Sequence, residues 1–114
     1  LSLCGQTTLR ETLAIVRRCS AAITMDAGPA HFAAAVGTPV VVFSLHPSDG
    51  DDTLDLAPAR FAPWCAENRK LIIQPDHAWP GCETGCRWRH VQPHCIGNID
   101  AAKASEKIRA FIAR

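Results

Sequence analysis

The start of the chain combines helical spacing with a short, continuous apolar run. Thr8 and Glu11 have the spacing of a capping box, in which each side chain caps the other residue's backbone amide. Apolar residues then recur at roughly helical intervals, which predicts a helix over residues 9–18. Residues 21–25 are apolar and bounded by polar residues, as in a parallel strand that is buried on both faces. We also expect residues 1–5 to be the end of a strand running into a loop.

A second helix and a second strand follow directly. Gly28-Pro29 predicts a helix start, because proline is favoured at the first helical position, and the small residues 30–36 continue the helix. Gly37 supplies the left-handed conformation that commonly ends a helix. Residues 40–43 form a β-branched run and predict another buried strand. Strand, helix and strand at this spacing imply a crossover between parallel strands, so the predicted fold class is α/β.

The pattern is weak from Ser44 to about Ile99, where only residues 71–73 resemble a strand. A connection this long usually has a function or docks on another element. Asp100 then predicts the start of a last helix with one apolar stripe. The stripe consists of Ala101, Ala104, Ile108, Phe111 and Ile112.

Length, composition and charge narrow the class of protein. The chain has 114 residues, 47% hydrophobic and 20% charged, which is typical of one globular domain. The net charge is +1 and the basic residues are scattered, so we expect no nucleic-acid partner. No apolar run approaches the roughly 20 residues that span a bilayer, and the first residues do not resemble a signal peptide. We therefore expect a cytoplasmic location.

The stretch Asp26-Ala27-Gly28-Pro29-Ala30-His31 holds the candidate chemistry. It joins the end of a predicted strand to the start of a predicted helix, the edge at which α/β sheets bind ligands. The first helical turn leaves amides unpaired and is electropositive, so it suits a phosphate. Gly28 allows close approach, His31 can donate a ring N–H to the phosphate, and Asp26 can accept from a hydroxyl. This pattern predicts a diphosphate site.

The same residues also have a plainer interpretation. Asp26 and Gly28 are common turn residues, and His31 can be an ordinary histidine at a helix start. The residues of this junction alone leave both interpretations open.

Two patterns in the first half of the chain resemble one enzyme family. They are Leu3-x-Gly5-x-Thr7-x-Leu9-x-Glu11 and Asp26-x-Gly28-Pro29-x-His31-x-Ala33-Ala34-Ala35-x-Gly37-Thr38-Pro39-Val40-Val41. Over residues 3–43 the chain closely resembles glycosyltransferase family 9, the lipopolysaccharide heptosyltransferases. A looser resemblance, at the cysteines 82, 86 and 95, Ile99 and the last helix, means that most of the chain is similar to that family's C-terminal domain.

The resemblance implies a GT-B architecture, in which two Rossmann-like halves face each other across a cleft. The chain would then be part of the C-terminal, nucleotide-sugar-binding domain over residues 1–114, with the acceptor domain and its carboxylate base absent. The resemblance also implies which residues bind the diphosphate and sugar of the donor. They are Asp26, Ala27, Gly28, Pro29 and His31.

Thr7 would lie near the nucleotide base by the same resemblance. The implied donor is ADP-heptose and the implied acceptor is a lipid-linked saccharide of the lipopolysaccharide core, bound through the missing domain. The implied reaction inverts the sugar's anomeric carbon and uses no cofactor or metal. The resemblance also allows peripheral association with the inner face of the inner membrane.

The chain departs from the family in two ways. The loop after the second strand usually contains F-G-P-T, whereas residues 43–48 read Phe-Ser-Leu-His-Pro-Ser. A lysine and an acidic residue of the family would precede residue 1, so we expect weak donor binding and an inactive fragment. A non-catalytic nucleotide- or phosphate-binding module is the alternative function. The acidic run that follows, residues 49–52, is better interpreted as a solvated loop than as a metal site.

The cysteines and tryptophans leave further alternatives open. Cys82, Cys86 and Cys95, with His90 and His94, contain enough ligands for zinc, but the spacing is poor. A disulfide or free thiols are the other interpretations, and a zinc-stabilised interaction domain is a third hypothesis for function. We expect Cys4 and Cys19 to pack as small hydrophobes. The three tryptophans, at 64, 79 and 88, receive no function.

Overall fold

Three parallel strands and the helices beside them make up the part of the chain that the computed structural model describes, residues 1–52, 57–80 and 95–114. In chain order the elements are α1 (Leu9–Val16), β1 (Ala22–Met25), α2 (Gly28–Ala35), β2 (Val40–Phe43), α3 (Pro58–Phe61), a 3-10 turn (Glu67–Arg69), β3 (Lys70–Ile73), a second 3-10 turn (Cys95–Asn98) and α4 (Ala101–Ile112).

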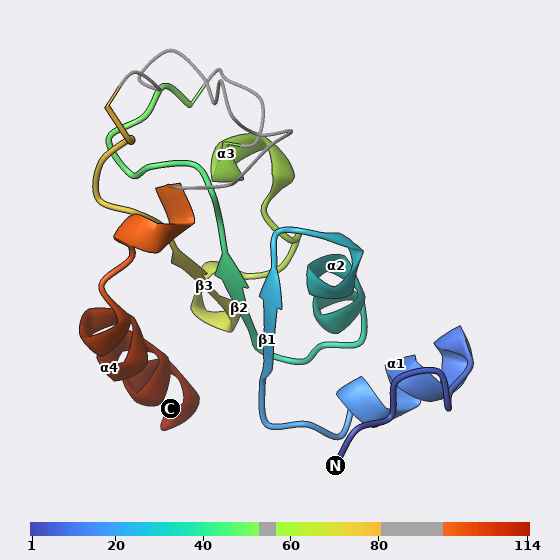
Figure 1. Cartoon of the computed structure of the whole chain (residues 1–114). Coiled ribbons are helices and arrows are strands. Elements are labelled where there is room, and N and C mark those ends of the chain that lie inside the picture. Colours follow the sequence, from blue (N-terminus) through green and yellow to red (C-terminus); the bar gives the residue numbers. More distant parts are fainter. Residues whose placement is uncertain (53–56, 81–94) are drawn as a thin grey trace.

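The sheet has the order β1-β2-β3 and all its strands are parallel (Figure 1). Val40, at the start of β2, pairs with Ala22 of β1 and with Lys70 of β3. The carboxyl ends of the three strands therefore lie at one edge of the sheet. The predicted α/β fold class with a Rossmann-like parallel sheet is confirmed, and so is the strand predicted at residues 71–73.

The central strand β2 is buried on both faces, as predicted. Val40 and Val42 are at most 1% exposed and pack against Ala30 and Ala33 of α2. Val41 points to the opposite face and packs with Ala104 and Phe111 of α4 and with Ile73 of β3. The two helices thus cover opposite faces of β2, as side-chain alternation along a strand requires.

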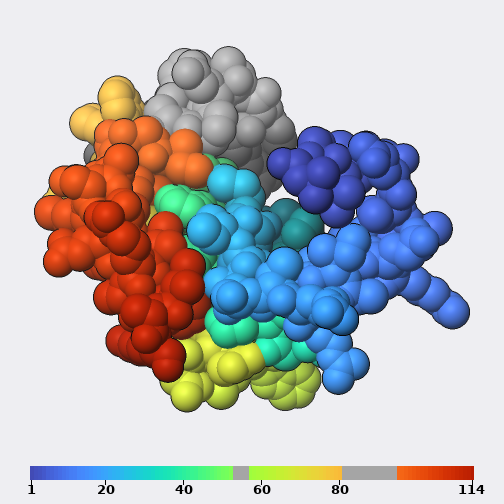
Figure 2. Space-filling view, turned by 90° about the horizontal axis from the view of Figure 1, so that it is seen from below, coloured from blue at the N-terminus to red at the C-terminus, as the bar shows by residue number. Residues whose placement is uncertain are grey.

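The first strand is not buried on both faces, contrary to prediction. Ala22 packs against the α2 side, but Ile23 and Met25 are 57% and 45% exposed. They line a groove of about 540 Å³ together with residues of α4, because α4 packs against β2 and β3 and does not cover β1. Seen from below, the C-terminal helix α4 and the N-terminal segment lie on opposite sides of the molecule (Figure 2).

The helix ends follow the sequence signals closely. The capping box of α1 is present, with both the Thr8 and the Glu11 side chains bonded to backbone amides. Gly37 has φ = +79° after α2, the left-handed conformation that was predicted there. The first helix ends at Val16, two residues before the predicted end, because the amides of residues 18 and 19 bond three residues back and tighten the chain.

The first residues form a turn and not the end of a strand. The Gln6 amide donates to the Leu3 carbonyl at 3.0 Å, and Gly5 has φ = +71°. A strand would need a neighbour for its ladder, and none pairs with residues 1–5 in the described chain. Cys4 and Cys19 are exposed, so the prediction that they pack as small hydrophobes is wrong.

The last helix is capped by the Asp100 carboxylate, which accepts from the amides of residues 102 and 103. Its apolar stripe is confirmed at Ala104, Ile108 and Phe111, which pack on the sheet. Ala101 and Ile112, at the two ends of the stripe, are exposed instead. Among the described residues, no helix has the length and apolar character needed to cross a membrane.

Ala33 fixes how closely α2 approaches the sheet, because its side chain is 0% exposed. We expect Ala33→Leu to lower the free energy of unfolding by about 1–3 kcal/mol, since the added atoms have no space between helix and strand. Ala35→Leu, at an exposed position of the same helix, is the matched control and should change it by less than about 0.5 kcal/mol. Urea unfolding measures both variants; equal effects would contradict this packing.

Candidate functional site

The candidate site is the junction between β1 and α2. The Asp26 amide donates to the Phe43 carbonyl at 3.1 Å, which extends the pairing of β1 with β2 by one residue. Ala27 is the N-cap residue and Gly28 and Pro29 begin the helix, as predicted. The structure therefore brings the predicted residues of this stretch together at the carboxyl edge of the sheet.

The amino end of α2 has no side-chain cap. Thr8 caps α1 and Asp100 caps α4, but no described side chain bonds to the first turn of α2, whose N-cap residue is Ala27. Pro29 lacks an amide hydrogen, which reduces the number of donors that need a partner. The remaining electropositive end can accept an anion from outside the chain.

Gly28 is not required by the backbone or by packing. Its φ is not positive, and a Cβ built on it would meet only the Phe32 ring, at 3.9 Å. By contrast, Gly5 and Gly37 have positive φ, and their conformation favours glycine. A small residue at position 28 therefore leaves open space above the turn, which suits close approach of a ligand.

Asp26 and His31 interact electrostatically across the first turn of α2. Partial burial raises the pKa of the Asp26 carboxyl above its ordinary value of 3.8, while the charge of His31 acts in the opposite direction. The imidazole of His31 is exposed. The pair places a carboxylate acceptor and a ring donor on either side of the uncapped helix end.

Thr7 lies before α1 and not in this junction. Its hydroxyl forms a 2.9 Å hydrogen bond with the Thr12 hydroxyl, within the first turn of α1. This contact directs the Thr7 side chain along its own helix. Its proposed role near a nucleotide base stays a prediction.

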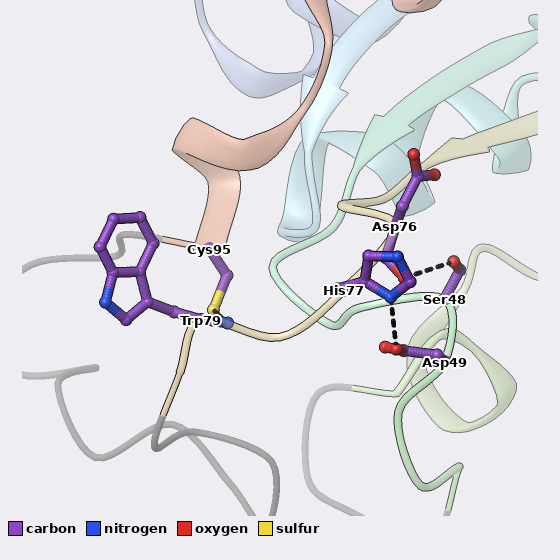
Figure 3. A network of polar contacts seen from close by, with 6 residues as sticks. All are labelled: Ser48, Asp49, Asp76, His77, Trp79 and Cys95. Atoms are coloured by element: carbon purple, nitrogen blue, oxygen red, sulfur yellow. Dashed lines mark hydrogen bonds and ion pairs between the residues drawn. The ribbon is translucent and has the colours of Figure 1, made fainter.

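The loops that follow β2 and β3 are bonded to each other at the same edge of the sheet. The Ser48 amide donates to the Pro75 carbonyl at 2.9 Å, and the Ser48 hydroxyl donates to the Asp76 carbonyl at 3.2 Å. Asp49 and His77 add an ion pair of 2.7 Å between Oδ2 and Nδ1. Figure 3 shows these residues side by side.

The Asp49–His77 pair was not predicted, because the two residues lie 28 positions apart and no local pattern connects them. The hydrogen bond to Asp49 and its charge raise the pKa of His77 above 6.5, and the same hydrogen bond lowers the pKa of Asp49 below 3.8. Asp49, the first residue of the acidic run, is thus an exposed partner of a histidine. Across the described part of the chain, no three potential ligands are clustered for a metal.

His46 is buried in the loop after β2. Its side chain is 6% exposed, and its Nε2 has no hydrogen-bond partner among the described residues. The backbone of Gly50 covers the ring so closely that a Cβ there would lie 2.8 Å from Nε2. This packing favours glycine at position 50, because a side chain there would displace the imidazole.

His31 also lines a groove that the sequence did not reveal. The groove lies beside α2 and has a volume of about 680 Å³, and its opposite wall is α3 and the segment that follows. Trp64 borders it, although it received no function from the sequence. Linear spacing carries no signal for this arrangement, since Trp64 lies 33 positions after His31 (64 − 31) and the segment between them is not periodic.

The cysteine cluster falls largely outside the described residues, because Cys82, Cys86, His90 and His94 are not among them. Cys95 is buried, and its sulfur accepts a 3.5 Å hydrogen bond from the Trp79 amide (Figure 3). The choice between zinc, a disulfide and free thiols stays open.

The first part of the chain matches the model of a known protein family. The model of glycosyltransferase family 9 (heptosyltransferase) matches residues 1–49, which contain α1, β1, α2, β2 and the start of the loop after β2. This match supports a glycosyltransferase of family 9. No curated protein matches the chain, and no solved structure does.

The coupling between Asp26 and His31 gives a titration test. Because the charge of His31 lowers the pKa of Asp26, we expect His31→Gln to raise that pKa further above 3.8. NMR titration of the Asp26 carboxyl carbon measures the change, and His77→Gln is the control that should leave Asp26 unaffected. An unchanged or lower pKa in His31→Gln would show that the two groups are not coupled.

The Asp49–His77 pair should make the stability of the two loops depend on pH. The raised pKa of His77 means that its contribution is complete below pH 6.5 and is lost as the pH rises through that raised value. The contribution of Asp49 is present above pH 3.8 and is lost as the pH falls through its lowered pKa. The contribution of the ion pair to stability is therefore complete between about pH 3.8 and pH 6.5.

We expect Asp49→Asn to move the pKa of His77 down toward 6.5, with Asp76 still exerting a smaller upward effect. NMR titration of the His77 ring protons follows the change. Asp52→Asn, in the same exposed run, is the matched control and should leave His77 unchanged. A His77 pKa that is equal in both variants would rule out the ion pair.

Proposed function

We propose that the chain is the donor-binding, C-terminal part of an inverting heptosyltransferase-like glycosyltransferase of the GT-B type. The family match over residues 1–49 supports the class of enzyme. The three-stranded parallel sheet is compatible with part of a Rossmann-like half. The proposed donor is a nucleotide sugar, ADP-heptose by resemblance.

The uncapped amino end of α2 is the observation on which the proposal rests. A diphosphate there would accept hydrogen bonds from the Gly28 amide and from the His31 ring, because Pro29 has no amide hydrogen and the Ala30 amide already donates to the Ala27 carbonyl. The open space above Gly28 lets the phosphate approach the backbone. Asp26, half-buried beside it, would accept from a sugar hydroxyl.

The proposed chemistry divides between two domains. Transfer to an acceptor hydroxyl needs a base that removes the hydroxyl proton, and it needs donors that stabilise the departing diphosphate. In this proposal the Gly28 amide and His31 supply the second requirement. The base would come from an N-terminal acceptor domain, so the chain by itself would bind the donor without transferring the sugar.

The acceptor and the location belong to the same proposal. A heptosyltransferase acting on the lipopolysaccharide core would meet a lipid-linked saccharide at the inner face of the inner membrane. The alternative, a non-catalytic phosphate-binding module, would use the same helix end. Transfer activity of the chain joined to an acceptor domain would separate these two functions.

Calorimetric titration with ADP, GDP and UDP tests the donor site. We expect saturable binding of ADP that weakens about tenfold or more in the double variant Asp26→Ala, His31→Ala, because the variant loses hydrogen bonds to charged or sugar groups. The chain offers a matched control, Asp49→Ala, His77→Ala, which removes a second Asp–His pair. That control should bind ADP as the unaltered chain does.

Two outcomes would count against this donor site. One is equal loss of ADP binding in both double variants, which would indicate a general effect on the fold. The other is unchanged binding in Asp26→Ala, His31→Ala, which would place the nucleotide elsewhere. Thermal unfolding of each variant separates loss of the site from loss of structure.

A further inference from the structure

The groove beside α2 has a mixed lining. Its floor includes Ile72 of β3, and its walls include Pro63 and the charged groups of Glu67 and Lys70. Lys70 Nζ and Glu67 Oε1 form an ion pair of 2.7 Å, and the Glu67 side chain is 87% exposed, so its carboxylate is accessible to a ligand. The volume of about 680 Å³ is within the range of small-molecule sites, about 300–1,000 Å³.

Trp64 is the unusual residue of this groove, because its side chain is 99% exposed. Large aromatic side chains normally bury most of their surface. Its neighbours are anchored: Pro63 is fully buried, and Cys65, which packs against the core, donates its amide to the Pro63 carbonyl at 3.0 Å. The indole is thus presented to solvent from a fixed segment.

The groove shares a residue with the proposed donor site, which indicates the kind of ligand it would bind. His31, in the first turn of α2, lines one end of it. A group attached to a phosphate that His31 binds would therefore lie in the groove that Trp64 also lines. Neither Thr7 nor any residue of α1 lines this groove.

The lining favours a pyranose over a nucleobase. A pyranose has an apolar C–H face that can lie on an indole, and a rim of hydroxyls that bonds to carboxylate and ammonium groups. Glu67 and Lys70 supply such groups beside Trp64.

We propose that Trp64 is a stacking platform for a pyranose ring, with Glu67 as acceptor for its hydroxyls. The ring is either the sugar of the donor or a sugar of the acceptor, and both sources offer the same chemistry. The inference deepens the proposed function, because it assigns a saccharide subsite next to the proposed diphosphate site. Trp64 would act in substrate specificity and not in the chemical step.

The test uses the tryptophan indole N–H signals of the whole chain, which has three tryptophans. Trp64→Phe assigns the signal of residue 64. We expect methyl α-mannopyranoside at high millimolar concentration, or ADP-heptose, to shift that signal, while ADP alone leaves it in place. Trp79→Phe, at a position 43% exposed and outside the groove, is the matched control.

Affinity provides the second readout. If the ring comes from the donor, ADP-heptose should bind more tightly than ADP, and Trp64→Ala should remove that advantage without weakening ADP. If it comes from the acceptor, Trp64→Ala should abolish calorimetrically measured binding of the methyl glycoside and leave ADP-heptose binding unchanged. The expected loss is on the order of tenfold to a hundredfold, as for stacking on an aromatic side chain.

Two results would overturn the inference. One is a Trp64 signal that shifts with ADP alone, which would indicate nucleobase stacking. The other is a signal that responds to neither saccharide. The methyl glycoside has no phosphate and needs no diphosphate site. A shift of the Trp64 signal by the glycoside would therefore support the saccharide subsite even if ADP does not bind and the proposed donor site is wrong. Trp64→Ala should keep the unfolding temperature, because the removed ring is exposed.

Discussion

The burial of β2 on both faces is the constraint that organises the described structure. Val40, Val41 and Val42 are each at most 1% exposed, and consecutive side chains point to opposite faces. One strand therefore requires two covers, and α2 and α4 supply them. Parallel pairing with β1 and β3 then places all three carboxyl ends at one edge. The candidate donor site and the bonded loops lie at that edge because of this arrangement.

The close packing of α2 connects the core to the site. Ala30 and Ala33 are fully buried, so the helix lies near the sheet and its amino end stands directly after β1. A helix end in this position would normally be capped, and α1 and α4 are. Asp26 sits beside the uncapped end with a raised pKa, which means that its charged form is disfavoured by burial. Missing caps and partly buried charges lower stability, and such features are expected where a ligand supplies the missing partners.

Local signals in the sequence predicted most elements of the first half of the fold, including the junction between β1 and α2. The capping box at Thr8, the proline at position 29 and the glycine at position 37 each act within one turn of chain, and each was found as predicted. Burial was harder to predict for β1, because apolar residues such as Ile23 do not reveal whether a second layer covers them. The segment that contains Trp64 has no periodic pattern, so its place beside His31 depends on contacts between distant residues. The same is true of Asp49 and His77.

The first residues of the loop after β2 are held against β3 by hydrogen bonds. Ser44 is buried, donates its amide to the Ile73 carbonyl and accepts from the His46 amide, so the chain continues to pair with β3 beyond the strand. The Gln74 side chain donates to the His46 carbonyl at 2.9 Å, and Gly50 closes over the imidazole. These bonds fix residues 44–48 to β3 and to the residues after it. None of the residues 44–50 lines the groove beside His31, so a substrate bound there would contact α2 and the segment of Trp64 and not this part of the loop.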